Sequence, residues 1–301
     1  MKKILLATTI LGMSAGYAAA DITWGGSATA GIAQNGTANL GLANPNAAVD
    51  GDGVLLTDDA FHTYSSANLA VTMSGTSDSG LTFGATFDLT AGTSYTLADD
   101  DGFANEGAVF GMPTVFVEGS FGKLAFSTDN YDFYDDSNAG GDVEYTGTFS
   151  GFSVGVIADV DTNNASAKVG YTVGALALSA NADTYDLWNV EGTYTMGAIA
   201  ITAATDESSN SSLKLAYSNN GMSASAKYNT NSGTDNPSVD VAVGYSANGL
   251  SVNASADDVS KANHTYQIWT VTASYDLGGG LSVEGGTNYT QDMMVGAKMS
   301  F

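Results

Sequence analysis

The segment Leu81–Leu89 reads LTFGATFDL, and its apolar residues occupy every second position while Thr, Gly and Asp fill the positions between them. An apolar period of two is typical of a strand that has one apolar face and one polar face. The same period runs through Phe152–Asp159, Val239–Tyr245 and Leu250–Ser255. The sequence therefore predicts an all-β chain whose strands each bury one face in a non-aqueous environment.

Short glycine-containing turns follow these strands at one end. Five related segments place a Tyr just before such a turn: YTVGALA at Tyr171, YTMGAIA at Tyr194, YSNNGMS at Tyr217, YSANGLS at Tyr245 and YDLGGGLS at Tyr275. We count eight short turns in all, at Gly75–Gly80, Gly119–Lys123, Ser150–Gly151, Val173–Gly174, Met196–Gly197, Asn219–Gly221, Ala247–Gly249 and Leu277–Gly280.

Several connections at the opposite strand ends are longer, richer in acidic residues, Asn or Gly, and more variable. They are Asn35–Ala60, Ala91–Pro113, Asp129–Gly141 and Thr230–Pro237. Short turns on one side and irregular loops on the other are typical of an outer-membrane barrel with periplasmic turns and extracellular loops. Eight turns with both termini on the same side predict a closed, antiparallel barrel of eighteen strands.

The N-terminal segment has the features of a secretory signal peptide. Lys2 and Lys3 precede the apolar run Ile4–Met13, which is too short to span a bilayer as a helix. The small residues Ala18, Ala19 and Ala20 then suit a cleavage site. We expect residues 1–20 to be removed and residues 21–301 to form a single transmembrane domain.

Composition limits the functional classes further. The chain carries a formal net charge of −24, has no cysteine, and its eight basic residues are all lysine. So acidic a protein is unsuited to binding nucleic acid, whose phosphates attract Lys and Arg. No apolar run after the N-terminal segment is long enough for a membrane-spanning helix.

The positions of the charged residues support a barrel wall. Counting alternate positions from the nearest aromatic residue, which marks the apolar face, places four lysines on the polar face: Lys168, Lys214, Lys227 and Lys298. Nine strand acids share that phase: Asp88, Glu118, Glu144, Asp159, Asp183, Glu191, Asp240, Asp257 and Glu284. A lysine facing lipid at the bilayer midplane costs about 2–4 kcal/mol, so these charges should line a water-filled lumen. A soluble β-sandwich is the alternative.

Aromatic residues should mark the membrane boundary beside the short turns. Tyr combines a ring that suits lipid with a hydroxyl that suits water. The predicted girdle consists of Tyr171, Tyr194, Tyr217, Tyr245 and Tyr275, together with Phe149.

Three stretches resemble the Rhodobacter-type general porins of alphaproteobacterial outer membranes: Thr72–Leu89, Gly119–Ser127 and Ser274–Gly286. The resemblance implies a homotrimer of sixteen-stranded, water-filled channels for passive diffusion of small hydrophilic solutes, surrounded by lipid and lipopolysaccharide. It also implies that Phe301, with apolar residues in its phase, is the signal read by the barrel-assembly machinery. The chain departs from this family in its turn count and in having no arginine to face the acidic loop.

In that family the third long loop folds inward and narrows the pore. By order of connections this is Asp129–Asp142, whose candidate constriction residues are Asp129, Asp132, Asp135, Asp136 and Asp142. The longer connection Ala91–Met112 is the alternative. Tyr131, Phe133 and Tyr134 are candidates for packing the third loop against the wall. The predicted excess of acids in the lumen, with Glu144, Glu191, Asp240 and Glu284 on the wall, indicates a preference for cations.

Little in the sequence indicates catalysis or a cofactor. The only histidines, His62 and His264, lie at the loop ends of strands, and no phosphate-binding or dinucleotide motif is present. The acidic loops are compatible with weak Ca²⁺ binding or with simple solvation, but Asp99–Asp101 does not have the spacing of an EF-hand. Besides a diffusion porin, a substrate-selective eighteen-stranded channel and a non-conducting acidic surface β-protein remain as functional alternatives.

Overall fold

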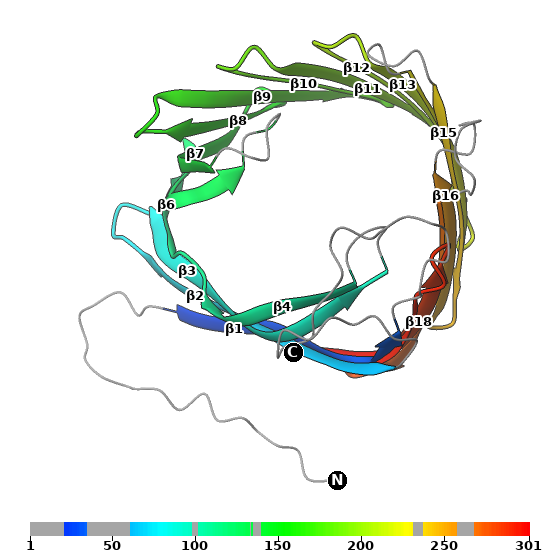
Figure 1. Cartoon of the computed structure of the whole chain (residues 1–301). Coiled ribbons are helices and arrows are strands. Elements are labelled where there is room, and N and C mark those ends of the chain that lie inside the picture. Colours follow the sequence, from blue (N-terminus) through cyan, green and yellow to red (C-terminus); the bar gives the residue numbers. More distant parts are fainter. Residues whose placement is uncertain are drawn as a thin grey trace.

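The structure is a computed structural model that describes residues 21–34, 61–97, 102–132, 134, 140–230, 237–257 and 268–301. The predicted signal peptide lies outside the described residues. Within them the chain forms strands joined by turns, and no helix there is long and apolar enough to cross a membrane. Figure 1 shows the strands arranged as a ring.

Nineteen strands follow one another along the described chain. They are β1 (Asp21–Gln34), β2 (His62–Thr76), β3 (Thr82–Thr96), β4 (Gly102–Phe110), β5 (Thr114–Gly119), β6 (Gly122–Asp132), β7 (Gly140–Phe149), β8 (Phe152–Asp159), β9 (Asn164–Val173), β10 (Leu176–Asp183), β11 (Trp188–Met196), β12 (Ile199–Asp206), β13 (Ser211–Asn219), β14 (Met222–Thr230), β15 (Ser238–Ala247), β16 (Leu250–Asp257), β17 (Ile268–Gly278), β18 (Leu281–Asn288) and β19 (Met293–Ser300).

The ring is closed by the first and last strands. β1 and β19 pair antiparallel from Ser27 opposite Ser300 to Gln34 opposite Met293. Two further backbone hydrogen bonds extend this seam, because Gly26 N donates to Phe301 O at 2.9 Å and Phe301 N donates to Gly26 O at 3.1 Å. Closure removes the two edges of the sheet, so the backbone groups of the wall can pair even where lipid offers them no partner.

The wall has eighteen strand positions, because β4 and β5 share one of them. β3 pairs with β4 through Leu89–Thr96 and with β5 through Thr82–Thr86. Elsewhere each strand pairs antiparallel with its neighbours in the chain. The eighteen strands predicted from the turn count are therefore confirmed, and the sixteen implied by the resemblance are not found.

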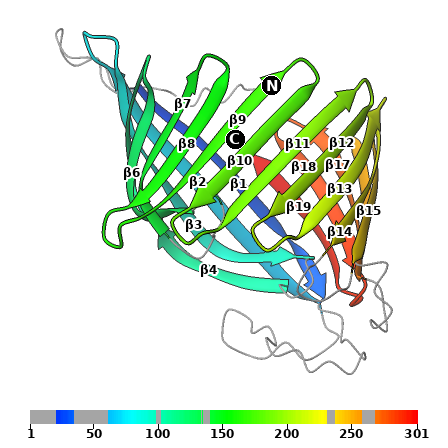
Figure 2. The same ribbon diagram turned by 90° about the horizontal axis from the view of Figure 1, so that it is seen from above.

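All eight predicted short turns join consecutive strands on one side of the barrel. The turn at Ser150–Gly151, the least marked of them in the sequence, has φ values of 50° and 87°. Such paired positive φ values suit a two-residue hairpin turn between twisted strands. On the other side, four connections are also short, namely residues 160–163, 184–187, 207–210 and 289–292. The strands tilt along the wall, as Figure 2 shows.

Candidate pore wall and constriction

The outward face of the wall is a nearly continuous apolar surface. Cross-strand partners on this face match apolar with apolar: Tyr194 lies opposite Leu176 and Ile201, and Tyr275 lies opposite Leu250 and Val283. Large apolar side chains stay exposed along it, among them Val243 at 59% and Leu213 at 55%. A surface of this extent is stable only in contact with lipid.

The five predicted girdle tyrosines all lie on this outward face next to the short turns. Tyr171 stacks on Phe152 with ring centroids 4.4 Å apart. The structure also places outward aromatic residues at the opposite strand ends: Trp188 on β11, Tyr228 on β14 and Trp269 on β17. This second set was not predicted as a girdle from the sequence, although each of these residues shares the apolar phase of its strand.

The inward face carries the predicted charges. Lys168, Lys214, Lys227 and Lys298 and the nine strand acids alternate with the outward apolar residues of their strands. Lys214 and Lys227 lie directly opposite each other on β13 and β14, and Lys227 lies opposite Asp240 on β15. Asp240 also accepts a hydrogen bond from Asn229 Nδ2 at 2.7 Å.

Among the remaining predicted wall residues, Glu191, Glu284 and Lys298 have only small or polar cross-strand neighbours, whereas Glu144 also faces Ile157. Glu191 lies opposite Ser179 and Ala204, and Glu284 lies opposite Ser274 and Gly296. Glu144 lies opposite Ala125 and Ile157. Lys298 lies opposite Thr29 and Ser282. Short partners leave room for Glu191, Glu284 and Lys298 to project from the wall.

Further charges share the inward phase, among them Asp206, Asp276 and Lys123. Lys123 lies opposite Glu118 and Thr146, and its Nζ sits 4.7 Å from the centroid of the Phe116 ring. Lys123 is therefore a fifth inward lysine that the sequence-based prediction of four did not include. The alternation of Lys123 with the outward residues Leu124 and Phe126 would have identified it.

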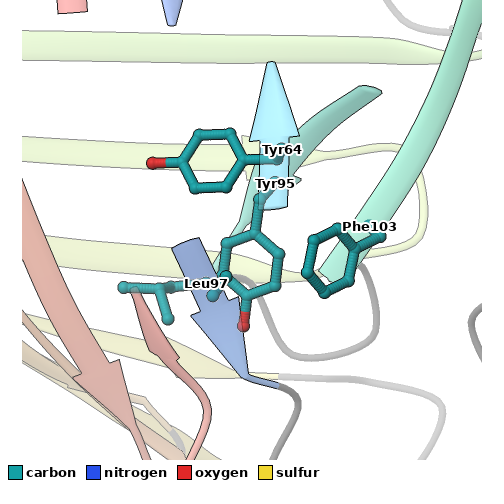
Figure 3. Packing of buried hydrophobic residues seen from close by; sticks show 5 residues of the cluster. Tyr64, Tyr95, Leu97 and Phe103 are labelled. Carbon is teal, nitrogen blue, oxygen red and sulfur yellow. The ribbon is translucent and has the colours of Figure 1, made fainter. Parts of the chain in front are cut away.

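The hairpin formed by the end of β3 and by β4 lies inside the ring (Figure 1). Its side chains Tyr95, Leu97 and Phe103 form a buried cluster with Ala33 of β1 and Tyr64 of β2. Figure 3 shows Tyr64, Tyr95 and Phe103 lying side by side, with Leu97 next to Tyr95. The Tyr64 and Tyr95 ring centroids are 5.9 Å apart, and those of Tyr95 and Phe103 are 4.8 Å apart.

Hydrogen bonds join the same hairpin to the wall. Tyr95 Oη donates to the Gln34 carbonyl at 3.2 Å, and Asn288 Nδ2 on β18 donates to the Leu97 carbonyl at 3.2 Å. Asn288 is itself fixed by a 2.9 Å bond to the Asp292 carboxylate. At the loop end of β2, His62 packs edge-on against Phe103, with the ring centroids 5.8 Å apart. His62 thus takes part in docking the hairpin.

The connection between β6 and β7 docks on a different part of the inner wall. Tyr134 N donates to Ser166 Oγ at 3.1 Å, and Asn181 Nδ2 donates to the Tyr134 carbonyl at 3.0 Å. Lys168 Nζ lies 5.7 Å from the centroid of the Tyr134 ring. A Cβ at Gly155 would collide with the Tyr134 hydroxyl, so this close approach requires glycine. Burial, with a smaller effect from Glu144, raises the pKa of the Tyr134 hydroxyl.

Only part of the predicted constriction loop can be placed. Asp132 ends β6 opposite Gly140, and Asp142 accepts a hydrogen bond from Val160 N at 3.0 Å. Asp135, Asp136, Phe133 and the side chain of Asp129 lie outside the described residues. Beneath the connection, the inward side chains of Ala125, Ile157 and Ser166 are almost fully buried.

Metal-binding groups do not gather anywhere in the described part of the chain: no three His, Asp or Glu side chains there lie close enough to hold an ion. Asp99–Asp101 lies outside that part.

Comparisons with known proteins agree with this architecture. The chain matches the family described as Gram-negative porin over residues 7–298. Solved structures of Rhodopseudomonas blastica porin mutants superpose with TM-scores of 0.56 and 0.57 at 15% and 14% sequence identity. Each of the two comparisons covers 93% of this chain and 100% of the other. A search among curated proteins finds no match.

The family match spans almost the whole chain, and the fold is a closed antiparallel barrel with an apolar exterior and a charged interior. Both place the protein in the outer membrane of a Gram-negative bacterium as a multi-pass β-barrel. The chain belongs to the family of Gram-negative porins, which form channels across that membrane.

Proposed function

We propose that this porin is a passive diffusion channel for small hydrophilic solutes and ions, and that it prefers cations. The observation that carries the proposal is the charge of the inward face. The nine predicted acids with Asp206 and Asp276, and the four predicted lysines with Lys123, amount to eleven acids and five lysines. A water-filled passage lined mainly by one sign of charge concentrates counter-ions and repels co-ions.

The lysines are too few and too scattered to reverse this field. Lys123 and Lys168 each lie over an aromatic ring, and Lys227 lies opposite Asp240. The chain has no arginine. Screening of the wall charges by salt should weaken the preference for cations as the salt concentration rises, because the Debye length falls from about 10 Å at 0.1 M to about 3 Å at 1 M.

A diffusion channel also fits the aromatic residues better than a substrate-selective one. A stacking track for sugars needs aromatic faces open to the lumen. Tyr64, Tyr95 and Phe103 are 3%, 7% and 9% exposed because they pack on one another. Lys123 lies over the ring of Phe116. These inward aromatic residues therefore serve packing, which favours passage of solutes without strong recognition.

Reversal potential across a planar bilayer in a salt gradient tests the ion preference. The wild-type potential should have the sign of cation selectivity and should shrink toward zero in high salt. The triple variant Glu191→Gln, Asp240→Asn and Glu284→Gln should shift the potential toward anions, whereas Lys214→Gln with Lys227→Gln should shift it toward cations. An anion-selective wild type, or variants that move the potential in the same direction, would refute the proposal.

We propose in addition that the protein is exported with loss of residues 1–20, is inserted by the barrel-assembly machinery through Phe301, and forms a homotrimer surrounded by lipopolysaccharide. The family supports these expectations. The small outward residues Ala30 and Ala297 are direct partners across the β1–β19 seam, beside Gly26 and Ala28, and make a flat patch for a neighbouring barrel. A native mass measurement on detergent-extracted protein should give three chains, and a monomer would contradict this assembly.

A further inference from the structure

We propose that the β3–β4 hairpin, rather than the β6–β7 connection, is the main narrowing element of this pore and sets its size limit. The proposal rests on the chain being a channel, as the family indicates, but not on its ion preference. The hairpin is defined here as residues 89–110, of which residues 89–97 and 102–110 are described.

The first observation is that β4 leaves the wall. Among the described strands β4 pairs only with β3, whereas β5 pairs with both β3 and β6. The chain between β4 and β5 contains Gly111 and Pro113. Gly111 N is held by a 2.8 Å bond to the Asp88 carbonyl, while Pro113 has no N–H to donate. The strand position is therefore filled by β5 near the short turns, and β4 is released from it toward the loop side.

The second observation is a bend built from two glycines. Gly92 of β3 and Gly107 of β4 are direct partners, and the register shifts between Gly92 and Thr93. Their φ values are +114° and +62°, in the region that favours glycine. A Cβ at Gly92 would also collide with the Ser65 carbonyl oxygen. A bulge of this kind bends a strand pair, and here the part beyond the bend lies inside the ring (Figure 1).

The third observation is how far the hairpin reaches. Its residues contact Tyr64 of β2 and Gln34 of β1, and they end at Asn288 of β18, which binds the Leu97 carbonyl. Met294 of β19 packs against the same buried cluster. β18 is four positions around the ring from β3. At about 4.8 Å per strand, this distance is about 19 Å of the wall. The β6–β7 connection, by contrast, has only seven residues between its strands and docks through Tyr134.

These dimensions give the expected effect on the pore. Eighteen strands about 4.8 Å apart and tilted by about 40° make a ring about 36 Å across between backbones. Side chains reaching about 5 Å from each wall leave about 26 Å, and a strand layer packed on one wall removes about 10 Å of that. Removing the hairpin should therefore widen the narrowest section by roughly 1.6-fold in one dimension.

The test compares three variants in single-channel conductance and in liposome swelling with sugars of increasing size. The first lacks residues 94–104, which removes the part of the hairpin beyond the bend. The second, Tyr95→Ser with Leu97→Ser, keeps the chain length but removes the docking side chains. The third, Tyr134→Ala, is the matched control that releases the β6–β7 connection.

Docking is measured separately with a cysteine in place of Ala33, which is fully buried under the hairpin. The chain has no cysteine of its own. A membrane-impermeant thiol reagent should label Ala33→Cys slowly in the otherwise wild-type protein and rapidly in the shortened variant. Thr29→Cys, on the same face of β1 but outside the buried cluster, should react in both.

We expect the single-channel conductance of the shortened variant to be at least roughly 1.5-fold that of the wild type, in proportion to the wider section. This variant should also admit larger sugars. The double serine variant should change in the same direction, and Tyr134→Ala should change less than either. Unchanged conductance and size limit in the shortened variant would overturn the proposal, as would a larger effect of Tyr134→Ala. The sign of the reversal potential is scored independently, so an error about ion preference would not be mistaken for an error about the hairpin.

Discussion

A lysine at Val243 should destabilise the barrel far more than a lysine at its neighbour Ala242. Val243 lies at the centre of β15, is 59% exposed, and lies opposite Ala224 and Ala254. Ala242 faces the other way, opposite Ser225 and Ser255. The two positions thus share strand, depth and partners of similar size, and differ only in the face they occupy.

The free-energy cost of each lysine depends on whether its side chain faces lipid or water. Lys on the lipid face at the bilayer midplane costs about 2–4 kcal/mol, whereas in a water-filled lumen it keeps its hydration. At 1.4 kcal/mol per factor of ten, Val243→Lys should lower the folding equilibrium constant by roughly 30- to 1000-fold. Ala242→Lys should change it by well under tenfold, because nearby acids such as Asp240 oppose any repulsion from Lys227.

Reversible urea unfolding of barrels folded into lipid vesicles gives the two free energies of unfolding, with tryptophan fluorescence as the signal. The wild-type protein and Val243→Ala provide the baseline for loss of the apolar side chain alone. Equal destabilisation by the two lysines, or a larger effect at Ala242, would refute the assignment of faces on which the description of the pore depends.

One further outcome follows from the packing of the first strand. Replacing Gly26 by Leu should weaken the pairing of β1 with both of its neighbours, because a Cβ there would meet Asn68 O of β2 at 2.6 Å and the ring of Phe301, which follows β19, at 2.9 Å. In semi-native electrophoresis the folded form of this variant should be lost at a lower temperature than that of the wild type. Ala28→Leu, which has the same outward phase, is the control.

The wall of the barrel could be predicted because it depends on local rules. Strand phase follows from alternation within one segment such as Leu81–Leu89, and strand number follows from counting turns. Even the weakly marked turn at Ser150–Gly151 was counted correctly, and the count was a better guide than the resemblance. Lys123 was overlooked although the same alternation places it on the inward face.

The contacts inside the pore could not be predicted from local sequence patterns. The bond between Asn288 and Leu97 joins residues 191 positions apart in the chain, and it exists only because ring closure brings β18 close to β1 and β2. Nothing around Tyr95 or Leu97 indicates that their partners are Ala33 and Tyr64. For this reason the choice between Ala91–Met112 and Asp129–Asp142 as the narrowing segment could not be made from the sequence. The structure shows that both contribute residues that dock on the inner wall.

The most direct test of the central claim is the reactivity of neighbouring cysteines in the intact membrane. Asp240 and Val241 are adjacent on β15, with Asp240 opposite Lys227 and Val241 38% exposed on the apolar surface. A membrane-impermeant thiol reagent should label Asp240→Cys rapidly through the water-filled lumen and leave Val241→Cys unreacted in lipid. Labelling of Val241→Cys with protection of Asp240→Cys would contradict the account.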